Sequence, residues 1–203
     1  SLLWERELEN IFIGLEKPGP AFQGADFMKF IKTNLAGAYL LELEAVEDER
    51  GFFARTFCRQ EFAGRGLNFT VAQVNLSHNR KRGTLRGMHY QEEPMAEAKV
   101  VQCVSGSLYD VIIDLRPQSP AYCRWVGMEL SAANRRLLYV PEGFAHGFQT
   151  LEDDTAVYYL MSQFYAPEYA RGVRWNDPAF GIKWPLSDPI ISEKDRQLPD
   201  YRK

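Results

Sequence analysis

The sequence predicts an all-β protein of the sandwich, jelly-roll or barrel class, with 203 residues in one main domain. From residue 39 onward, roughly ten short runs are rich in β-branched and aromatic residues. Turn sequences such as DERG, RPQSP and PEGF separate these runs at even spacing. Residues 58–66 (CRQEFAGRG) are the best candidate for a short helix, so helices should contribute little.

Each expected strand combines a strand-like composition with a turn signal at its end. In chain order they are YLLELEAV (39–46), FFARTF (52–57), TVAQVNLSH (70–78), KVVQCVSG (99–106), LYDVIIDLR (108–116), RWVGMEL (124–130), RLLYVP (136–141), HGFQTL (146–151) and TAVYYLMSQFY (155–165). In the fifth strand, Val111, Ile113 and Leu115 alternate with Ile112 and Asp114. This pattern predicts a strand that is covered on most of both faces.

The two ends of the chain differ from this pattern. Apolar residues recur at helical spacing over residues 1–15, which predicts an amphipathic helix, and EKPGPAFQG (16–24) favours a linker. We therefore expect residues 1–27 to be an N-terminal extension, either native or added by engineering. Residues 28–203 would form the β domain, with a polar, proline-marked tail that reaches across the mouth of a pocket.

Composition excludes several classes of protein. The net charge of −3 and the pI of about 5.7 do not favour nucleic acid or an anionic membrane as a partner. No apolar run approaches the roughly 20 residues of a membrane span. The cysteines, Cys58, Cys103 and Cys123, are odd in number and widely spaced, as expected for reduced thiols in a cytoplasmic protein.

The chain contains three histidines, His78, His89 and His146. PEGFAH (141–146) matches the second half of the cupin metal motif, PxGxxH. The first half is missing, because His89 has no second histidine two residues away. Zinc or iron would lack ligands here, so we expect no metal and no other cofactor.

The stretch GTLRGMHYQ (83–91) combines an arginine, a histidine and two glycines. His89 is either a hydrogen-bonded core histidine or a general base, whose ordinary pKa suits proton transfer at neutral pH. Arg86 and Lys99 lie close in sequence, and buried cations are rare without an anionic partner, which favours a functional site. Tyr158 and Tyr159 point to opposite faces of a strand, so one of them can line a cavity, or both can be packing aromatics.

Six motifs occur in the order found in one known family. They are DERGFF (48–53), LRGMHYQ (85–91), KVVQCVSGSLYDVIIDLR (99–116), SPAYCRWVGMELSAANRRLLYVPEGFAHGF (119–148), FYAPEYARGVRWNDPAFGIKWP (164–185) and SEKD (192–195). Between about Asn34 and Arg196 the chain thus resembles the dTDP-4-dehydrorhamnose 3,5-epimerases. The resemblance implies a cupin-type jelly roll (a double-stranded β-helix) that forms a metal-independent homodimer. The implied reaction converts dTDP-4-keto-6-deoxy-D-glucose to dTDP-4-keto-L-rhamnose in deoxysugar biosynthesis.

The resemblance also implies roles for individual residues. His89 would be the base, oriented by Asp195, and Tyr159 would be the acid. Lys99 would lie near the enolate oxygen. The residues implied to bind substrate are Arg86, His146 and Lys194 around the sugar and diphosphate, and Arg50, Gln73 and Asn75 at the nucleotide end.

Two departures from the family pattern leave alternatives open. Arg55 stands where RGFFxE usually has a glutamate that touches the nucleoside, and Val74 interrupts the usual QDN. A cation cannot accept a hydrogen bond, so a CDP-linked or other nucleotide sugar is an alternative substrate. An enzyme that inverts one centre, a sugar-binding cupin without catalysis and a metal-dependent cupin isomerase or oxygenase are further alternatives.

Overall fold

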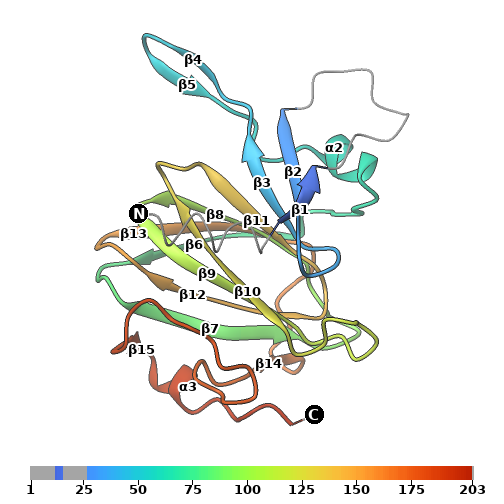
Figure 1. Ribbon diagram of the computed structural model, residues 1–203, viewed down its shortest axis with the longest axis vertical. Helices are drawn as coiled ribbons and strands as arrows, with labels where there is room; N and C mark the ends of the chain where they lie inside the picture. Colours follow the sequence, from blue (N-terminus) through green and yellow to red (C-terminus); the bar gives the residue numbers. More distant parts are fainter. Residues whose placement is uncertain (1–11, 16–26, 203) are drawn as a thin grey trace.

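The computed structural model describes residues 12–15 and 27–202 of the chain. Two β-sheets pack face to face, and two short helices lie outside them in the described part (Figure 1). The helices are α2 (Arg59–Gly64) and α3 (Glu193–Arg196). The all-β jelly roll with a few short helices is thus confirmed, including the helix expected within 58–66.

The larger sheet has seven strands. Their spatial order is β1 (Phe12–Leu15), β2 (Met28–Thr33), β3 (Tyr39–Leu43), β11 (Arg136–Val140), β8 (Lys99–Ser105), β13 (Thr155–Met161) and β6 (Gln73–Asn79). Neighbouring strands in this sheet are antiparallel. Strands that are far apart in the sequence, such as β8 and β13, lie side by side.

The second sheet has six strands. Its order is β10 (Trp125–Ser131), β9 (Ser107–Asp114), β12 (Phe144–Thr150), β7 (Thr84–Gln91) and β14 (Ala170–Gly172), and β15 (Ile190–Ile191) pairs with β7 in parallel. In β9 every residue except Tyr109 is buried, which confirms the strand expected to be covered on both faces.

Three clusters of buried side chains hold these layers together. The central one lies between the sheets and joins residues such as Val101 and Leu138 to Phe144 and Phe148. A second covers the outer face of the larger sheet beneath α2, and a third covers the outer face of the smaller sheet beneath residues 173–201. The interior between the sheets is the one place where side chains from both can meet.

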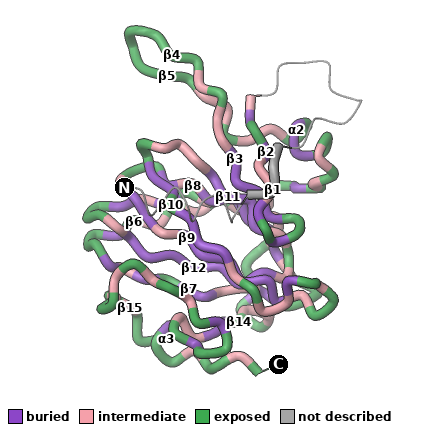
Figure 2. Tube along the Cα trace, viewed as in Figure 1, coloured by how far each residue is buried: buried purple, intermediate pink, exposed green. Residues whose placement is uncertain are grey.

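A hairpin of β4 (Val46–Asp48) and β5 (Gly51–Phe53) projects from one end of this body (Figure 1). All six of its strand residues are exposed, in contrast to buried strands such as β12 (Figure 2). In the part of the chain that the structure describes, no helix has the length and apolar character needed to cross a membrane.

The helix expected over residues 1–15 is wrong for Phe12–Leu15, which form β1 and pair with β2. Backbone pairing to a sheet edge decides the conformation there, whatever the local apolar spacing favours. Residues 1–11 and 16–26, which contain the rest of that helix and the whole linker, lie outside the described residues.

Candidate active site

A bulge in β7 places Arg86 and His89 on the inner face of the smaller sheet. In the register between β12 and β7, His146 lies opposite His89 and Phe148 lies opposite Arg86. Three residues along β7 therefore match two along β12. Phe148 belongs to the core between the sheets, and residues two apart in a strand share a face. Without the extra residue, Arg86 and His89 would point to opposite faces.

The bulge depends on two glycines whose backbones touch. Gly87 has φ +119, and a Cβ there would lie 2.7 Å from the Cα of Gly147. A Cβ on Gly147 would in turn lie 2.7 Å from the carbonyl oxygen of Arg86. Only glycine fits at both places, which explains one of the two glycines in the GTLRGMHYQ stretch.

The larger sheet presents further polar side chains to the same interior. Tyr159 pairs with Val101 on one side and with Asn75 on the other, and Val101 is a core residue between the sheets. Lys99 and Gln73 lie two residues along their strands from Val101 and Asn75, so they share the inner face. The candidate residues of β6, β8 and β13 therefore face those of β7 and β12.

These two walls meet at a cavity of about 430 Å³. Its lining residues are His89, Tyr90, Glu97, Lys99, Tyr159, Met161, Tyr165, Ala170, Arg171, Gly172, Lys194, Leu198 and Pro199. Four of the sequence-predicted site residues, His89, Lys99, Tyr159 and Lys194, are thus brought together, and Leu198 and Pro199 of the C-terminal tail also line the cavity.

Asp195 supports His89 from the tail. Its Oδ1 lies 2.7 Å from Nε2 of His89, and its Oδ2 accepts a hydrogen bond from the Gly87 amide at 3.4 Å. Ser192 caps α3 by accepting a hydrogen bond from the Asp195 amide at 3.1 Å. The short helix therefore fixes the carboxylate behind the imidazole.

The protonation of this pair follows from its surroundings. Burial alone would raise the pKa of Asp195, but the hydrogen bond and charge of His89, with the Gly87 and Ser192 contacts, outweigh it and lower the pKa. At neutral pH the carboxylate can only accept, so Nε2 of His89 carries a proton. Nδ1 then holds the lone pair that a general base needs.

Lys99 is buried in the opposite wall. Its Nζ lies 3.1 Å from Oε1 of Glu97 and donates to the carbonyl oxygen of His89 at 3.3 Å. This places a cationic group beside His89, inside the cavity.

Tyr159 lies half-buried on the same wall. Burial raises its pKa, and the charge of Arg86 opposes that rise without cancelling it. The phenol therefore keeps its proton through neutral pH and is able to act as an acid. Tyr158, on the outer face, is 37% exposed and lines another hollow instead.

Other sequence-predicted residues border the cavity without lining it. Arg86 donates from Nε to Asn79 at 2.7 Å, close enough to Tyr159 to affect its pKa. His146 is buried, with Nε2 2.8 Å from Oδ1 of Asp110. The inner-face position of Asn75 is described above, and Gln73 accepts a hydrogen bond from the Tyr165 amide.

Arg50 is not brought to this cavity. It lies in the projecting hairpin, where its guanidinium pairs with Asp48. Arg55 is also engaged elsewhere: its Nη1 lies 3.6 Å from Oε1 of Glu61, and its guanidinium lies 4.2 Å from the centre of the Phe27 ring.

Sequence reasoning missed two buried acids, Glu97 and Asp110. Each lies next to a residue that was singled out: Glu97 forms an ion pair with Lys99, and Oδ1 of Asp110 lies 2.8 Å from Nε2 of His146. A signal was available for Asp110, because a carboxylate interrupts an otherwise apolar run (LYDVII, 108–113). Glu97 lies two residues before Lys99 in a loop, where no periodicity marks it.

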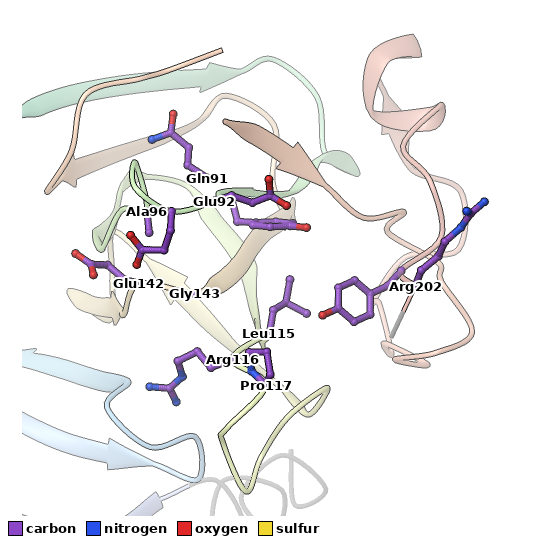
Figure 3. Close-up of a pocket in the computed structure, with 12 residues that line it drawn as sticks. Gln91, Glu92, Ala96, Leu115, Arg116, Pro117, Glu142, Gly143 and Arg202 are labelled. Atoms are coloured by element: carbon purple, nitrogen blue, oxygen red, sulfur yellow. The ribbon is translucent and has the colours of Figure 1, made fainter. Parts of the chain in front are cut away.

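A larger cavity of about 640 Å³ lies nearby, between the end of β7, the turn before β12 and the chain terminus (Figure 3). Its described lining includes Glu92, Glu142, Arg116 and Arg202 but no histidine or lysine. Among the described residues, no three His, Cys, Asp or Glu side chains are grouped so as to hold a metal. The smaller cavity is the one that combines a base, an acid and a cation.

Comparisons with known proteins agree on one family. The family model for dTDP-4-dehydrorhamnose 3,5-epimerase matches residues 32–203. An epimerase of that name from Methanothermobacter thermautotrophicus is 46% identical over 177 residues, which are 86% of this chain and 95% of the relative.

Solved structures give the same result. The enzyme of that name from Bacillus anthracis, with TDP and PPi bound, matches with a TM-score of 0.84 and 44% identity, over 86% of this chain and 99% of its own. A dTDP-6-deoxy-D-glucose-3,5-epimerase from Legionella pneumophila in complex with dTDP-4-keto-L-rhamnose has a TM-score of 0.81 and 34% identity, over 85% and 92% of the two chains.

Proposed function

Because the chain belongs to the dTDP-4-dehydrorhamnose 3,5-epimerase family, we propose that it inverts C3 and C5 of dTDP-4-keto-6-deoxy-D-glucose. The product is dTDP-4-keto-L-rhamnose. The C4 ketone makes the hydrogens on both neighbouring carbons acidic. Removal of one leaves an enolate, and reprotonation from the opposite face inverts the centre.

The observation that carries this mechanism is the placement of base and acid on facing sheets. His89 belongs to β7 of one sheet and Tyr159 to β13 of the other, and both line the same cavity. A sugar ring between them meets the base on one face and the acid on the other. Lys99, beside His89, supplies the positive charge that the enolate oxygen needs.

Asp195 acts through His89. Its carboxylate holds the Nε2 proton, so that Nδ1 accepts the proton from carbon and Asp195 stabilises the resulting imidazolium. Arg86 at the cavity edge is suited to the diphosphate because its guanidinium can fork onto two oxygens. His146 and Lys194 bind the sugar and phosphate, and Gln73 and Asn75 bind towards the nucleotide.

We assign the working enzyme as a homodimer. Arg50 binds the nucleotide end in this proposal, yet it lies in a hairpin that projects from the body (Figure 1) and does not line its own cavity, so it must serve the site of a second copy. The outer face of β6, β8 and β13 supports this, since it exposes Val74, Leu76, Val104 and Tyr158 to solvent. An apolar sheet face of this kind is suited to a second copy.

Arg55 is compatible with a dTDP-sugar. Glu61 and the Phe27 ring hold its guanidinium, and the Glu61 carboxylate also accepts hydrogen bonds from the amides of Phe27 and Met28 at 3.1 Å. The charge that departs from the family pattern is therefore balanced within the chain. We place the enzyme in the cytoplasm, in keeping with its three free cysteines.

The function is tested by incubating the protein with dTDP-4-keto-6-deoxy-D-glucose in deuterium oxide and counting deuterium by mass spectrometry. We expect a gain of two deuterium atoms, one at C3 and one at C5. His89→Ala should lose exchange at both carbons, by about 10²- to 10⁴-fold.

Lys81→Ala is the control, because Lys81 pairs with Asp153 at an exposed turn outside the cavity, and this variant should exchange like the wild type. Full exchange by His89→Ala would contradict the assigned base. A gain of only one deuterium would favour an enzyme that inverts a single centre.

A further inference from the structure

The ion pair of Lys99 and Glu97 is buried almost completely. Their exposed fractions are 5% and 6%, and both side chains line the candidate active-site cavity. Taking both charges out of water has a large desolvation cost, which strong pairing offsets. The position of this buried ion pair beside the candidate reaction centre indicates a role in the chemistry.

The contacts of Lys99 leave donor capacity for a ligand. Its ammonium carries three N–H groups; Nζ donates to the carbonyl oxygen of His89 at 3.3 Å and lies 3.1 Å from Oε1 of Glu97. Oε2 of Glu97 has no hydrogen-bond partner in the part of the chain that the structure describes. The ammonium is thus the main interaction of this carboxylate.

The substrate is a ketone, and this makes the charge of the lysine decisive. A neutral amine beside a ketone adds to the carbonyl carbon and, with loss of water, forms an imine. An ammonium has no lone pair, so it can only donate a hydrogen bond to the carbonyl oxygen. Burial alone favours the neutral amine, because desolvation disfavours a charge.

We propose that Glu97 is a positioning residue that keeps Lys99 as an ammonium and aims it at the C4 oxygen. The lysine then stabilises the enolate and does not bond covalently to the substrate. This inference rests on the proposed function, which supplies the ketone, and it explains why an acid outside the proton-transfer set lines the cavity.

Glu97→Gln tests the inference, since it keeps the size of the side chain and removes its charge. We expect kcat for deuterium exchange to fall at least about 10-fold, but no further than in Lys99→Met. KM should stay within about threefold, because the interaction lost is specific to the transition state.

The second measurement is trapping with sodium borohydride during turnover. In Glu97→Gln the amine of Lys99 should condense with the C4 ketone and release water, and hydride should reduce the imine to a secondary amine. The mass of the protein then rises by that of the attached nucleotide sugar. The wild type should give no adduct, and the double variant Glu97→Gln/Lys99→Met should give none either.

Two variants serve as controls. Glu142→Gln removes a carboxylate that lies close to Glu97 but lines the neighbouring cavity (Figure 3), and it should keep the wild-type kcat without an adduct. Glu97→Asp retains the charge on a shorter side chain, so it should stay free of adduct whatever its rate.

The outcomes separate this inference from the proposed function. Two results would contradict this inference if the wild type exchanges deuterium. In the first, Glu97→Gln has the wild-type kcat. In the second, it has a lower melting temperature and a reduced kcat but gives no adduct; in either case Glu97 does not hold the charge of Lys99. If the wild type itself does not exchange, the proposed function fails and this inference falls with it.

Discussion

At the scale of single residues, each proposed role depends on a neighbour that restricts what the side chain can do. The Asp195 carboxylate leaves His89 one nitrogen with a lone pair. Burial keeps the phenol of Tyr159 protonated. Base and acid are therefore distinguished by their surroundings, and each can be disabled without removing the other.

Tyr159→Phe should separate proton removal from inversion. His89 would still take a proton from carbon and return solvent deuterium to the same face. We expect deuterium in recovered substrate while formation of inverted product falls by about 10²- to 10⁴-fold. Mass spectrometry and NMR of the recovered sugar check this. Inversion at the wild-type rate would mean that another group donates the proton.

Asp195→Asn should lower kcat by about 10²- to 10⁴-fold, because an amide does not enforce a proton on Nε2 or stabilise the imidazolium. Binding of dTDP, measured by calorimetry, should change little since Asp195 lies behind His89. A large loss of nucleotide binding would show that the variant disturbs more than the base.

At the scale of elements, the bulge of β7 is the feature on which the site depends. In Gly87→Ala the new Cβ meets the backbone of Gly147, in addition to the cost of φ +119. Strained φ costs about 1–3 kcal/mol and overpacking typically about 1–3 kcal/mol more, so the free energy of unfolding should fall by about 2–6 kcal/mol.

Gly51→Ala is the control for that change, because Gly51 has φ +126 but no atom within 4 Å of the added Cβ. In denaturant unfolding, Gly51→Ala should lose only the about 1–3 kcal/mol that a strained φ costs. Equal losses in both variants would mean that the contact between Gly87 and Gly147 contributes nothing.

The helix α3 should detach from β7 in acid. The pKa of Asp195 is lowered below its usual 3.8, so its contribution to stability is full above that pH and is lost as the pH falls through the lowered value. In thermal melts, Asp195→Asn should be less stable than the wild type at neutral pH, and the difference should shrink below about pH 4. A constant difference at every pH would exclude this linkage.

The strands show where sequence patterns predict secondary structure correctly. The strands at 99–106, 108–116, 124–130 and 155–165 were predictable, because alternating apolar residues and turn signals mark them. The strand β7 was not among those expected, since its glycines, charged and polar residues lack a period of two. The bulge that breaks the alternation is also what gathers the site residues, so local pattern and function conflict there.

The residues of the candidate site were predictable in part. Resemblance indicated His89, Lys99, Tyr159 and Lys194, which the cavity brings together. Glu97 could not be singled out, because its significance comes from a three-dimensional contact with Lys99 and not from a pattern along the chain.

At the scale of the whole molecule, the proposed dimer predicts complementation. If the site of each subunit uses Arg50 from its partner, a hybrid of His89→Ala and Arg50→Ala subunits has one site with both residues intact. Random mixing of the two inactive variants should then restore about a quarter of wild-type activity. Measuring exchange before and after subunit mixing checks this. No recovery in a verified hybrid would mean that Arg50 does not serve the partner's site.

The hydrogen bond between His89 and Asp195 joins positions 106 residues apart. Contacts between such distant positions form slowly, because the long intervening loop must be closed first. During refolding, β-structure should therefore return before catalytic activity does. Activity is then a stricter measure of a completely folded chain than any spectroscopic signal from its sheets.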